Sequence, residues 1–450
     1  MQAVAFIEAP WREPAAVLTA LAEEPWAIGL ISDGDGPWSY VAARPDATLT
    51  LAADDPRDPF EALAALAGPP LPADPEGPPF QGGVAGLAGY ELGDRVEHLG
   101  LPRLSGWPDL ACARYLALLA FDHRRRRIVA IGRGSDSEEA RTWAAEALGW
   151  LSLPPPRAIA PGADLEADPP HEYEAAVAEV VARIRSGEIF QANIARRWRG
   201  RLAAGARPAD VLDGLAIASP APFASYLRLP GLALVSNSPE RFVEVRAQDG
   251  VLLAETRPIK GTAPRGADLA QDRANAEALL ASAKDRAENL MIVDLMRNDL
   301  GRVCEVGSVA APALFRLESF ANVHHLVSKV TGRLAEGRTA VDLLHATFPP
   351  GSITGAPKVQ AMKVIADLEP PRGPFFGAMF RLGFDGGFDS SVLIRTAAFA
   401  QDADGWSVEM RAGAGLVADS DPAAERRETE AKASALRTAL ESRASAATEG

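Results

Sequence analysis

The stretch SYLRLPGLALVSNSPERFVEVRAQDGVLLAETRPIKGT, residues 225–262, carries most of the information about the fold. SYLRL, LALVSN, RFVEVR and VLLAE are short runs of apolar and β-branched residues, separated by residues that favour turns. Each run is typical of a strand. The stretch therefore predicts several short strands in succession, with Lys260 at the point where the last strand gives way to a turn.

Helical patterns dominate other parts of the chain, with apolar residues three or four positions apart. They occur in SEEARTWAAEALGWL, HEYEAAVAEVVARIRSG, LAQDRANAEALLASAKDRAENLMIVDLMRNDLG, VQAMKVIADLE and PAAERRETEAKASALRTALESR. Strand runs and helix runs are both present, without a regular alternation of strand, helix and strand. The sequence therefore predicts an α+β fold with antiparallel or mixed sheets that helices cover.

A proline-rich segment, LSLPPPRAIAPGADLEADPP at residues 151–170, divides the chain into two regions. Prolines interrupt regular helices and strands, so we interpret this segment as a linker. The prediction is an N-terminal region at residues 1–150 and a second region at residues 171–440.

The composition limits the classes of partner. The 450-residue chain has 46 lysine and arginine residues against 60 aspartate and glutamate residues, a formal net charge of −14. This balance argues against nucleic acid or an anionic membrane as the main partner, although local donors or a metal ion could bind a small anion. The two cysteines predict neither a zinc site nor a disulfide framework. Without a signal peptide or a long apolar run, we expect a cytoplasmic protein.

Two helical segments each carry a pair of carboxylates three residues apart. They are Asp285 and Glu288 in AKDRAEN, and Glu425 and Glu428 in AAERRETEAK. Residues at this spacing share one face of a helix, so two facing helices could hold a divalent cation between one glutamate from each. Mg²⁺ commonly uses one or two protein carboxylates and keeps several waters, through which the second pair could act. Two solvated helix faces are the alternative.

Several features could hold an anionic substrate. PPGSITGAPK, residues 349–358, is a loop of small residues that opens a helix and offers backbone N–H groups and a threonine hydroxyl. The predicted Gly-Ala-Gly turn at residues 413–415 offers further backbone donors, and Arg395 could bind a carboxylate through two hydrogen bonds. His324 and His325 alternate along a strand, so at most one of them faces any given site. Ordinary turns, a sheet-edge arginine and structural histidines are the alternatives.

Lys260 lies between apolar Ile259 and permissive Gly261. Together with the features above, it suggests a site for a small dicarboxylate held by backbone donors, one arginine and Mg²⁺. Partial burial would lower the pKa of the Lys260 amine and make it a candidate nucleophile. A lysine that only forms a salt bridge is the alternative.

The chain is similar to a known family in the order of its motifs, which are TRPIKGT, SPERF, DRAENLMIVDLMRNDLGRV, HHLVS, PPGSITGAPK, IRT and AGAGLVADS…ERRETEAK. It resembles the aminodeoxychorismate synthase component I branch of the anthranilate synthase component I family of chorismate-utilising enzymes. The resemblance is highly specific at residues 171–440. In the first half it rests on FQGGVAGLAGYELG, residues 80–93, and on the LIS segment near Ser32.

The resemblance implies a four-layer α+β fold, with two large orthogonally packed sheets in the core and helices outside. The anthranilate synthase component I-like region at residues 1–150, the linker at 151–170 and the chorismate-binding catalytic region at 171–440 would then form one compact unit.

The resemblance also gives Lys260 a role. Anthranilate synthases have PIAGT at this site and aminodeoxychorismate synthases have PIKGT, which is the sequence here. The family mechanism implies that the Lys260 amine attacks C2 of chorismate as the C4 hydroxyl leaves. Ammonia then adds at C4 and expels the lysine, which gives 4-amino-4-deoxychorismate for 4-aminobenzoate and folate synthesis.

Other roles follow from the resemblance position by position. Glu240 of SPERF corresponds to the family's general acid/base, which would protonate the departing hydroxyl, and His325 to the family's active-site histidine. The expected chorismate contacts are Gly261, Thr262, Thr354, Phe375, Arg395, Gly413, Ala414 and Gly415. Gln191 stands where isochorismate-forming and salicylate-forming relatives have a lysine base, so activation of water at C2 is not expected.

The carboxylate pairs also match the family. Glu288 and Glu428 correspond to the Mg²⁺ ligands, with Asp285 and Glu425 in outer positions, and the metal would hold the ring carboxylate of chorismate.

Two positions depart from the pattern of the relatives, which have an aromatic residue followed by xGxxGY. Here Phe375 and Gly377 are present, but Phe380 and Arg381 replace the Gly-Tyr pair. Phe375 would keep the aromatic contact without a tyrosine hydroxyl.

Neither cysteine lies in a context suited to glutamine hydrolysis. The resemblance therefore implies that a separate glutamine amidotransferase subunit supplies ammonia, or that ammonia comes from solution. The nearest alternative is an anthranilate synthase component I, against which Lys260 argues. A catalytically silent relative would be expected to lack Glu240, Lys260, Glu288 or Glu428, and all four are present.

Overall fold

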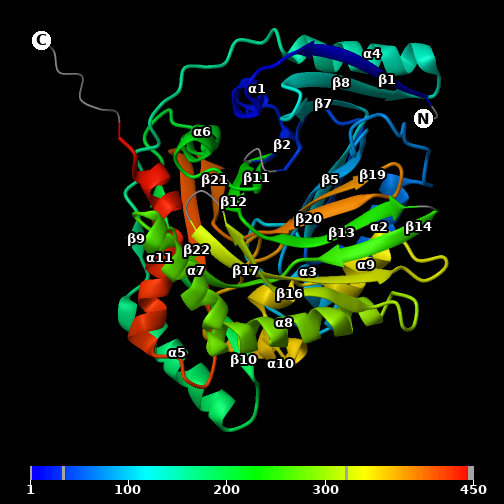
Figure 1. Cartoon of the computed structure of the whole chain (residues 1–450). Coiled ribbons are helices and arrows are strands. Elements are labelled where there is room, and N and C mark those ends of the chain that lie inside the picture. Colours follow the sequence, from blue (N-terminus) through cyan, green and yellow to red (C-terminus); the bar gives the residue numbers. More distant parts are fainter. Residues whose placement is uncertain (1–2, 33–35, 249, 320–322, 444–450) are drawn as a thin grey trace, which may run out of the picture.

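A computed structural model of the chain describes residues 3–32, 36–248, 250–319 and 323–443, and in these residues two antiparallel sheets are covered by helices (Figure 1). In sheet order, the larger sheet contains β1 (Ala3–Pro10), β8 (Arg127–Gly134), β7 (Ala117–Asp122), β3 (Trp38–Ala42), β2 (Ile28–Ile31), β11 (Phe223–Leu229), β12 (Leu232–Ser238), β21 (Thr396–Asp402), β22 (Gly405–Leu416), β10 (Gln191–Arg201) and β18 (Gly355–Ala356), and β9 (Glu166–Ala167) pairs with β10.

The smaller sheet contains, in order, β15 (Ile259–Pro264), β17 (Val323–Arg333), β14 (Val251–Thr256), β13 (Arg241–Gln248), β20 (Phe388–Val392), β19 (Ala378–Gly383), β5 (Gly83–Ala88), β6 (Leu110–Tyr115) and β4 (Ala47–Leu51), and β16 (Ala310–Ser319) pairs with β17. Each sheet combines strands from both sides of the proline-rich segment. The predicted α+β class with two large sheets and outer helices is confirmed.

The helices lie on the outer faces of the sheets. They are α1 (Pro14–Leu21), α2 (Pro59–Ala67), α3 (Leu92–Glu97), α4 (Ser137–Trp150), α5 (Pro170–Arg185), α6 (Pro208–Ala218), α7 (Leu269–Ala281), α8 (Ala283–Gly301), α9 (Ala340–Thr347), the short 3-10 helix η1 (Gly351–Ile353), α10 (Lys358–Leu368) and α11 (Pro422–Glu441). α4 packs on β1 and β8, α10 on β10 and β18, α11 on β22 and β10, and α8 on β17. Among the described helices, none is both long and apolar enough to cross a membrane.

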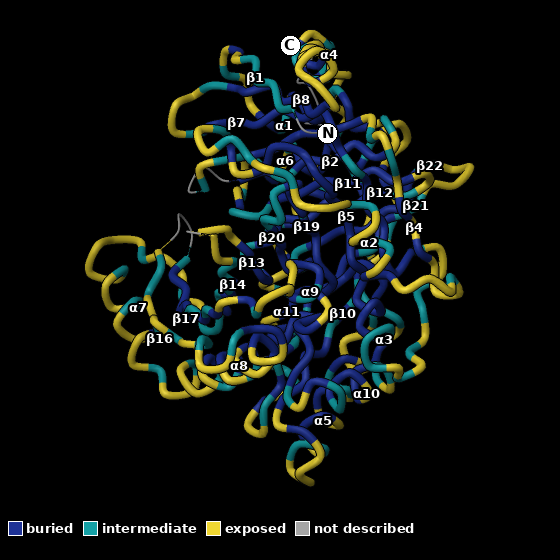
Figure 2. Tube along the Cα trace, turned by 90° about the vertical axis from the view of Figure 1, so that its right-hand side faces the viewer, coloured by how far each residue is buried: buried dark blue, intermediate teal, exposed yellow. Residues whose placement is uncertain are grey.

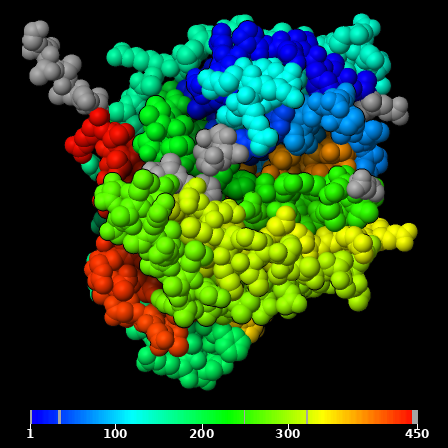
Figure 3. Space-filling model, in the orientation of Figure 1, coloured from blue at the N-terminus to red at the C-terminus, as the bar shows by residue number. Residues whose placement is uncertain are grey.

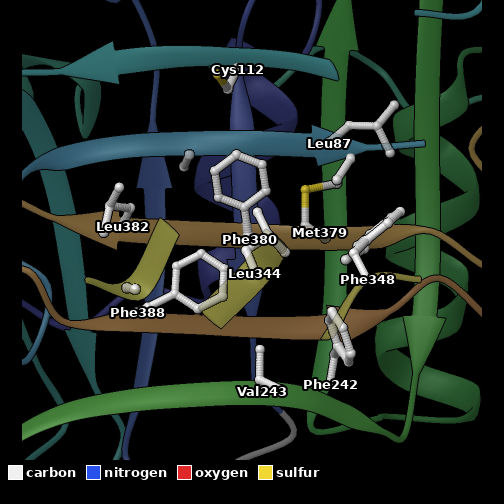
Figure 4. Close-up of a cluster of buried hydrophobic side chains, with 14 of the residues drawn as sticks. Leu87, Cys112, Phe242, Val243, Leu344, Phe348, Met379, Phe380, Leu382 and Phe388 are labelled. Carbon is white, nitrogen blue, oxygen red and sulfur yellow. The ribbon is translucent and has the colours of Figure 1, made fainter. Parts of the chain in front are cut away.

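The principal core takes buried side chains from both sheets and from α8 and α9. Figure 4 shows part of this cluster, in which the rings of Phe380 and Phe388 are stacked with centroids 5.9 Å apart. Cys112 belongs to the same cluster, and neither it nor Cys304 forms a disulfide. Figure 2 shows that buried residues follow the strands, whereas exposed residues gather on the peripheral helices and loops.

The strands predicted in residues 225–262 are present as β11 to β14, and the chain changes sheet part-way through them. β11 and β12 pair within the larger sheet, whereas β13 and β14 pair within the smaller one. The crossing segment between Ser238 and Arg241 contains Pro239 and Glu240.

Two predicted turns are strands in the structure. Lys260 is the second residue of β15, which continues because its residues pair with β17. Gly413 and Gly415 lie within β22, where they pair with Ala195 and Asn193 of β10. Long-range pairing, which the local sequence does not reveal, outweighs the turn tendency of these glycines.

Candidate active site

A cavity of about 550 Å³ gathers residues from segments that are far apart in the sequence. Its wall comes from β10, β15, β17, β22, η1, α8 and α11, and from the segments that join β12 to β13 and β20 to β21. Figure 3 shows α11 (red) beside the light-green region of α7 and α8 on one face of the molecule. The predicted site residues that line the cavity are Glu240, Lys260, Gly261, Thr262, Asp285, Glu288, His325, Arg395, Gly413, Gly415, Glu425 and Glu428.

A β-bulge places Lys260 at the cavity. Ile259 pairs with Val327 and Thr262 with His325, so two residues of β15 lie opposite one residue of β17. Gly261, one of the two residues in the bulge, has a φ of 83°, which glycine adopts without the steric cost that other residues incur. Bulges of this kind redirect a side chain, and here the redirected side chain is the amine of Lys260.

The Lys260 amine forms no ion pair within the described part of the chain, so a simple salt bridge does not explain it. Burial lowers its pKa, and the positive charge of Lys432 lowers it further. Glu288, Glu240 and Glu428 oppose the shift without cancelling it. A larger fraction of the amine is therefore unprotonated than on an exposed lysine, as a nucleophile requires.

Glu240 lies in the segment that crosses from one sheet to the other, and only 7% of its surface is exposed. Burial raises the pKa of its carboxyl to about 7, while a hydrogen bond from Ser352 and the charges of Lys260 and Lys432 limit the rise. A carboxyl group with this pKa can both give and take a proton near neutral pH.

The four carboxylates predicted on two helices lie around the same cavity, with Asp285 and Glu288 on α8 and Glu425 and Glu428 on α11. Burial raises the pKa of both Glu288 and Glu425, and the Ser420 hydroxyl donates a hydrogen bond of 2.7 Å to Glu425 Oε1. The alternative of two solvated helix faces is therefore wrong at least for Glu425, which is 6% exposed.

Two lysines accompany these carboxylates. Lys432 Nζ lies 2.7 Å from Glu428 Oε1, and Lys284 Nζ lies 3.8 Å from Glu288 Oε1. Desolvation would raise the pKa of the half-exposed Glu428, but Lys432, together with Lys260 and Lys284, outweighs this effect and lowers the pKa. No group of three or more His, Cys, Asp and Glu side chains among the described residues is arranged to hold a metal ion. Carboxylate oxygens are donors that a hard cation such as Mg²⁺ accepts, and this ion commonly keeps several waters.

Arg395 offers positive charge on another side of the cavity. It lies between β20 and β21, with a φ of 51° that is uncommon for a residue other than glycine. Burial lowers the pKa of its guanidinium group, and no carboxylate of the described residues pairs with it. An unpaired, largely buried guanidinium is suited to a carboxylate ligand.

The two neighbouring histidines of β17 face opposite ways, as the alternation along a strand predicts. His325 is at the cavity, and its Nδ1 lies 2.9 Å from Thr262 Oγ1. Burial, assisted by Arg395, lowers the pKa of His325 to about 4, so the imidazole is neutral near neutral pH. His324 instead contacts Ser319 and Asp272, at 2.8 and 3.1 Å.

The family described as chorismate binding enzyme matches residues 27–438. The chain belongs to this family. It is 39% identical to aminodeoxychorismate synthase component 1 from Klebsiella aerogenes, over 98% of this chain and 100% of that protein. It is also 39% identical to anthranilate synthase component 1 from Streptomyces coelicolor, over 91% of this chain and 82% of that protein. The solved structure of anthranilate synthase component I from Streptococcus pneumoniae matches with 30% identity and a TM-score of 0.79, over 89% and 92% of the two chains.

Three residues that the family resemblance predicted at the substrate do not line the cavity. The Thr354 hydroxyl is buried and donates to the carbonyls of Pro350 and Gly351, at 3.1 and 3.2 Å. It therefore stabilises the loop and does not face the cavity. Phe375 is buried under the guanidinium of Arg411, and its neighbour Phe376 faces the cavity instead.

The third is Ala414, and strand geometry explains its position. Successive residues of β22 face opposite sides, so Gly413 and Gly415 face the cavity while Ala414 packs into a core cluster. In the Gly-Ala-Gly motif of this chorismate-binding enzyme, the two glycines thus leave one face of the strand without side chains. The alanine between them packs on the opposite face.

Other residues at the cavity were not identified from the sequence: Asn193, Lys284, Ser352, Phe376, Arg411 and Lys432. A compositional signal could have found the two lysines. Only six of the 46 lysine and arginine residues are lysines, and three of them, Lys260, Lys284 and Lys432, line this cavity. In a chain that otherwise uses arginine, each lysine marks a place where a compact amine with an adjustable pKa is suitable.

Proposed function

We propose that this chorismate-binding enzyme is component I of an aminodeoxychorismate synthase, which replaces the C4 hydroxyl of chorismate by an amino group. Sequence identity does not distinguish between the two activities of the relatives. The chain is 39% identical both to an aminodeoxychorismate synthase component 1 and to an anthranilate synthase component 1. The observation that carries the proposal is Lys260, an amine of lowered pKa at the cavity, where the sequence pattern of anthranilate synthases has alanine.

In the first step, the lone pair of Lys260 Nζ forms a bond to C2 of the ring. Both ring double bonds shift, from C1=C2 to C1=C6 and from C5=C6 to C4=C5, the C4–O bond breaks, and the Glu240 carboxyl donates its proton so that the hydroxyl leaves as water. The pKa of about 7 for Glu240 supports this role, because the group still carries a proton near neutral pH.

In the second step, ammonia forms a bond to C4, both ring double bonds shift back, and the C2–N bond breaks to return the Lys260 amine. The Glu240 carboxylate takes the proton that the new ammonium group loses. Chorismate and ammonia thus give 4-amino-4-deoxychorismate and water, and the two side chains return to their starting forms.

Substrate binding would use both charged sides of the cavity. Arg395 would bind a carboxylate of chorismate, and neutral His325 with Thr262 would hold a polar group of the substrate through hydrogen bonds. Glu288 and Glu428 would hold Mg²⁺, with Asp285 and Glu425 acting through water, and the bound ion would supply positive charge for the ring carboxylate.

The proposal includes a separate glutamine amidotransferase subunit as the source of ammonia in the cytoplasm. The name component 1 of the relatives supports a second component. Both cysteines of this chain are buried, and burial raises the pKa of their thiols, that of Cys304 to about 11. Neither is therefore suited to be the thiolate that glutamine hydrolysis needs.

The test is a product assay with the purified chain, chorismate, Mg²⁺ and an ammonium salt, beside Lys260→Ala. We expect aminodeoxychorismate from the parent, trapped as 4-aminobenzoate by an added lyase, and its loss in the variant. Anthranilate from the parent would instead make the chain an anthranilate synthase component I. Aminodeoxychorismate from Lys260→Ala at the parental rate would contradict the covalent role of Lys260.

A further inference from the structure

Gln191, the first residue of β10, is a fully buried amide without a hydrogen-bond partner. Its side chain has no exposed surface, and neither Nε2 nor Oε1 has a partner in the described part of the chain. Burying an amide without hydrogen bonds is unfavourable, and such groups in folded proteins are nearly always satisfied. A polar group close to Gln191 must therefore be its partner when the enzyme works.

The amine of Lys260 lies close to the Gln191 amide, and Gly415, which has no side chain, makes the approach possible. A Cβ atom on Gly415 would lie 2.6 Å from Gln191 Nε2 and 3.0 Å from Lys260 Nζ. The side chains of Gln191 and Lys260 thus both lie close to Gly415, a position of β22 that has no side chain. Asn193, the other residue of β10 with a side-chain amide, lies close to Gly413 in the same way, since a Cβ on Gly413 would lie 2.4 Å from Asn193 Oδ1.

We infer that Gln191 is the positioning residue for Lys260, whose amine it holds by a hydrogen bond so that the lone pair faces the substrate. The inference rests on the role proposed for Lys260. An amide suits this task in both protonation states of the amine. Its oxygen accepts an N–H from Lys260, and its NH₂ group can donate to the lone pair when the amine is at rest.

The charged groups around Lys260 explain why a neutral partner is needed. Lys432 and Glu428 face it from α11, Glu288 from α8, and Glu240 from the crossing between the sheets. A carboxylate in place of the Gln191 amide would add one more negative charge beside the amine and favour its protonated form. The amide orients the nucleophile without that effect.

The test compares Gln191→Met, which removes both polar atoms, with Gln191→Glu, which keeps the shape and adds a charge. We expect Gln191→Met to lower kcat about tenfold, the effect of one hydrogen bond of ordinary strength, while KM stays within about twofold. In Gln191→Glu, the acid limb of kcat against pH should move up by about one pH unit or more, because a carboxylate close to an amine raises the pKa of that amine.

A spectroscopic readout is independent of turnover. With only six lysines in the chain, the side-chain resonances of isotope-labelled lysine can be assigned by substitution and followed against pH. The Lys260 resonance should titrate at higher pH in Gln191→Glu than in the parent. Gln81→Glu is the matched control, since Gln81 is 4% exposed and lies in the N-terminal region, and it should leave the Lys260 titration unchanged.

Parental kcat in Gln191→Met together with an unmoved Lys260 titration in Gln191→Glu would overturn the inference. If Gln191→Met does not fold, the Lys260 titration in the nearly isosteric Gln191→Glu variant still tests the inference. Failure of the proposed function has a different result, namely anthranilate as the product of the parent, and failure of the covalent role of Lys260 gives a Lys260→Ala variant that still forms aminodeoxychorismate.

Discussion

Replacing Glu240 by glutamine should destroy activity and yet stabilise the folded protein at alkaline pH. Burial raises the pKa of Glu240 from 4.5 to about 7, so the folded state resists ionisation of this group. The cost to stability is absent below pH 4.5, grows between 4.5 and about 7, and is complete above that value. At about 1.4 kcal/mol per pH unit, the full cost is about 3 kcal/mol.

The assay is urea unfolding of the parent and Glu240→Gln at pH 5 and pH 8. The free energy of unfolding of the variant, relative to the parent, should rise by about 2–3 kcal/mol between the two pH values, because glutamine has no proton to lose. Glu277→Gln, an exposed substitution on α7, controls for the change in surface charge and should show no such rise.

Glutamine cannot donate the proton that the departing hydroxyl needs, so kcat should fall by a factor of about 100 or more. An unfolding difference that is the same at pH 5 and pH 8 would refute the buried, largely protonated Glu240 and with it the argument for a general acid. Retained activity would refute the catalytic role while leaving the burial argument intact.

Three further substitutions separate the parts of the site. Arg395→Met should raise KM for chorismate about 10- to 100-fold, because a buried charge-assisted hydrogen bond is lost. If initial-rate kinetics of the variant give the parental KM, Arg395 is not a carboxylate ligand. Glu428→Gln should raise the Mg²⁺ concentration for half-maximal activity at least about tenfold, whereas the exposed substitution Glu172→Gln on α5 should not. Equal metal titrations of the parent and Glu428→Gln would argue against Glu428 as a ligand. Thr354→Val should lower the free energy of unfolding by about 1–2 kcal/mol with an unchanged KM, and a large increase in KM would return this hydroxyl to the substrate.

The local sequence predicted the elements well where a pattern repeats within one segment. The carboxylate pairs are an example, because the i and i+3 spacing on α8 and α11 fixes which residues share a face, and all four are at the cavity. The opposite orientations of His324 and His325 follow in the same way from the alternation along β17. These relations need no knowledge of the neighbouring elements.

Prediction was poorer where position depends on another strand. Gly413 and Gly415 suggested a turn, and only pairing with β10 keeps them extended. The bulge at Lys260 likewise depends on the register between β15 and β17. Phe375 and Phe376 are neighbours in the sequence, and only Phe376, whose backbone has a φ of 65°, lines the cavity.

The same stretch that reveals the fold also brings the two proposed catalytic groups together. After β12 the chain leaves the larger sheet at Pro239 and Glu240, runs outward along β13 and returns along antiparallel β14. The return is fixed at its inner end, where the Thr256 hydroxyl donates a hydrogen bond of 2.7 Å to the carbonyl of Phe242. Because a hairpin brings its two ends together whatever the length of its tip, Glu240 and Lys260 reach one cavity through strand pairing and not through closeness in the sequence. The bulge in β15 then turns the Lys260 amine inward, so the register of the smaller sheet sets the geometry between acid and nucleophile.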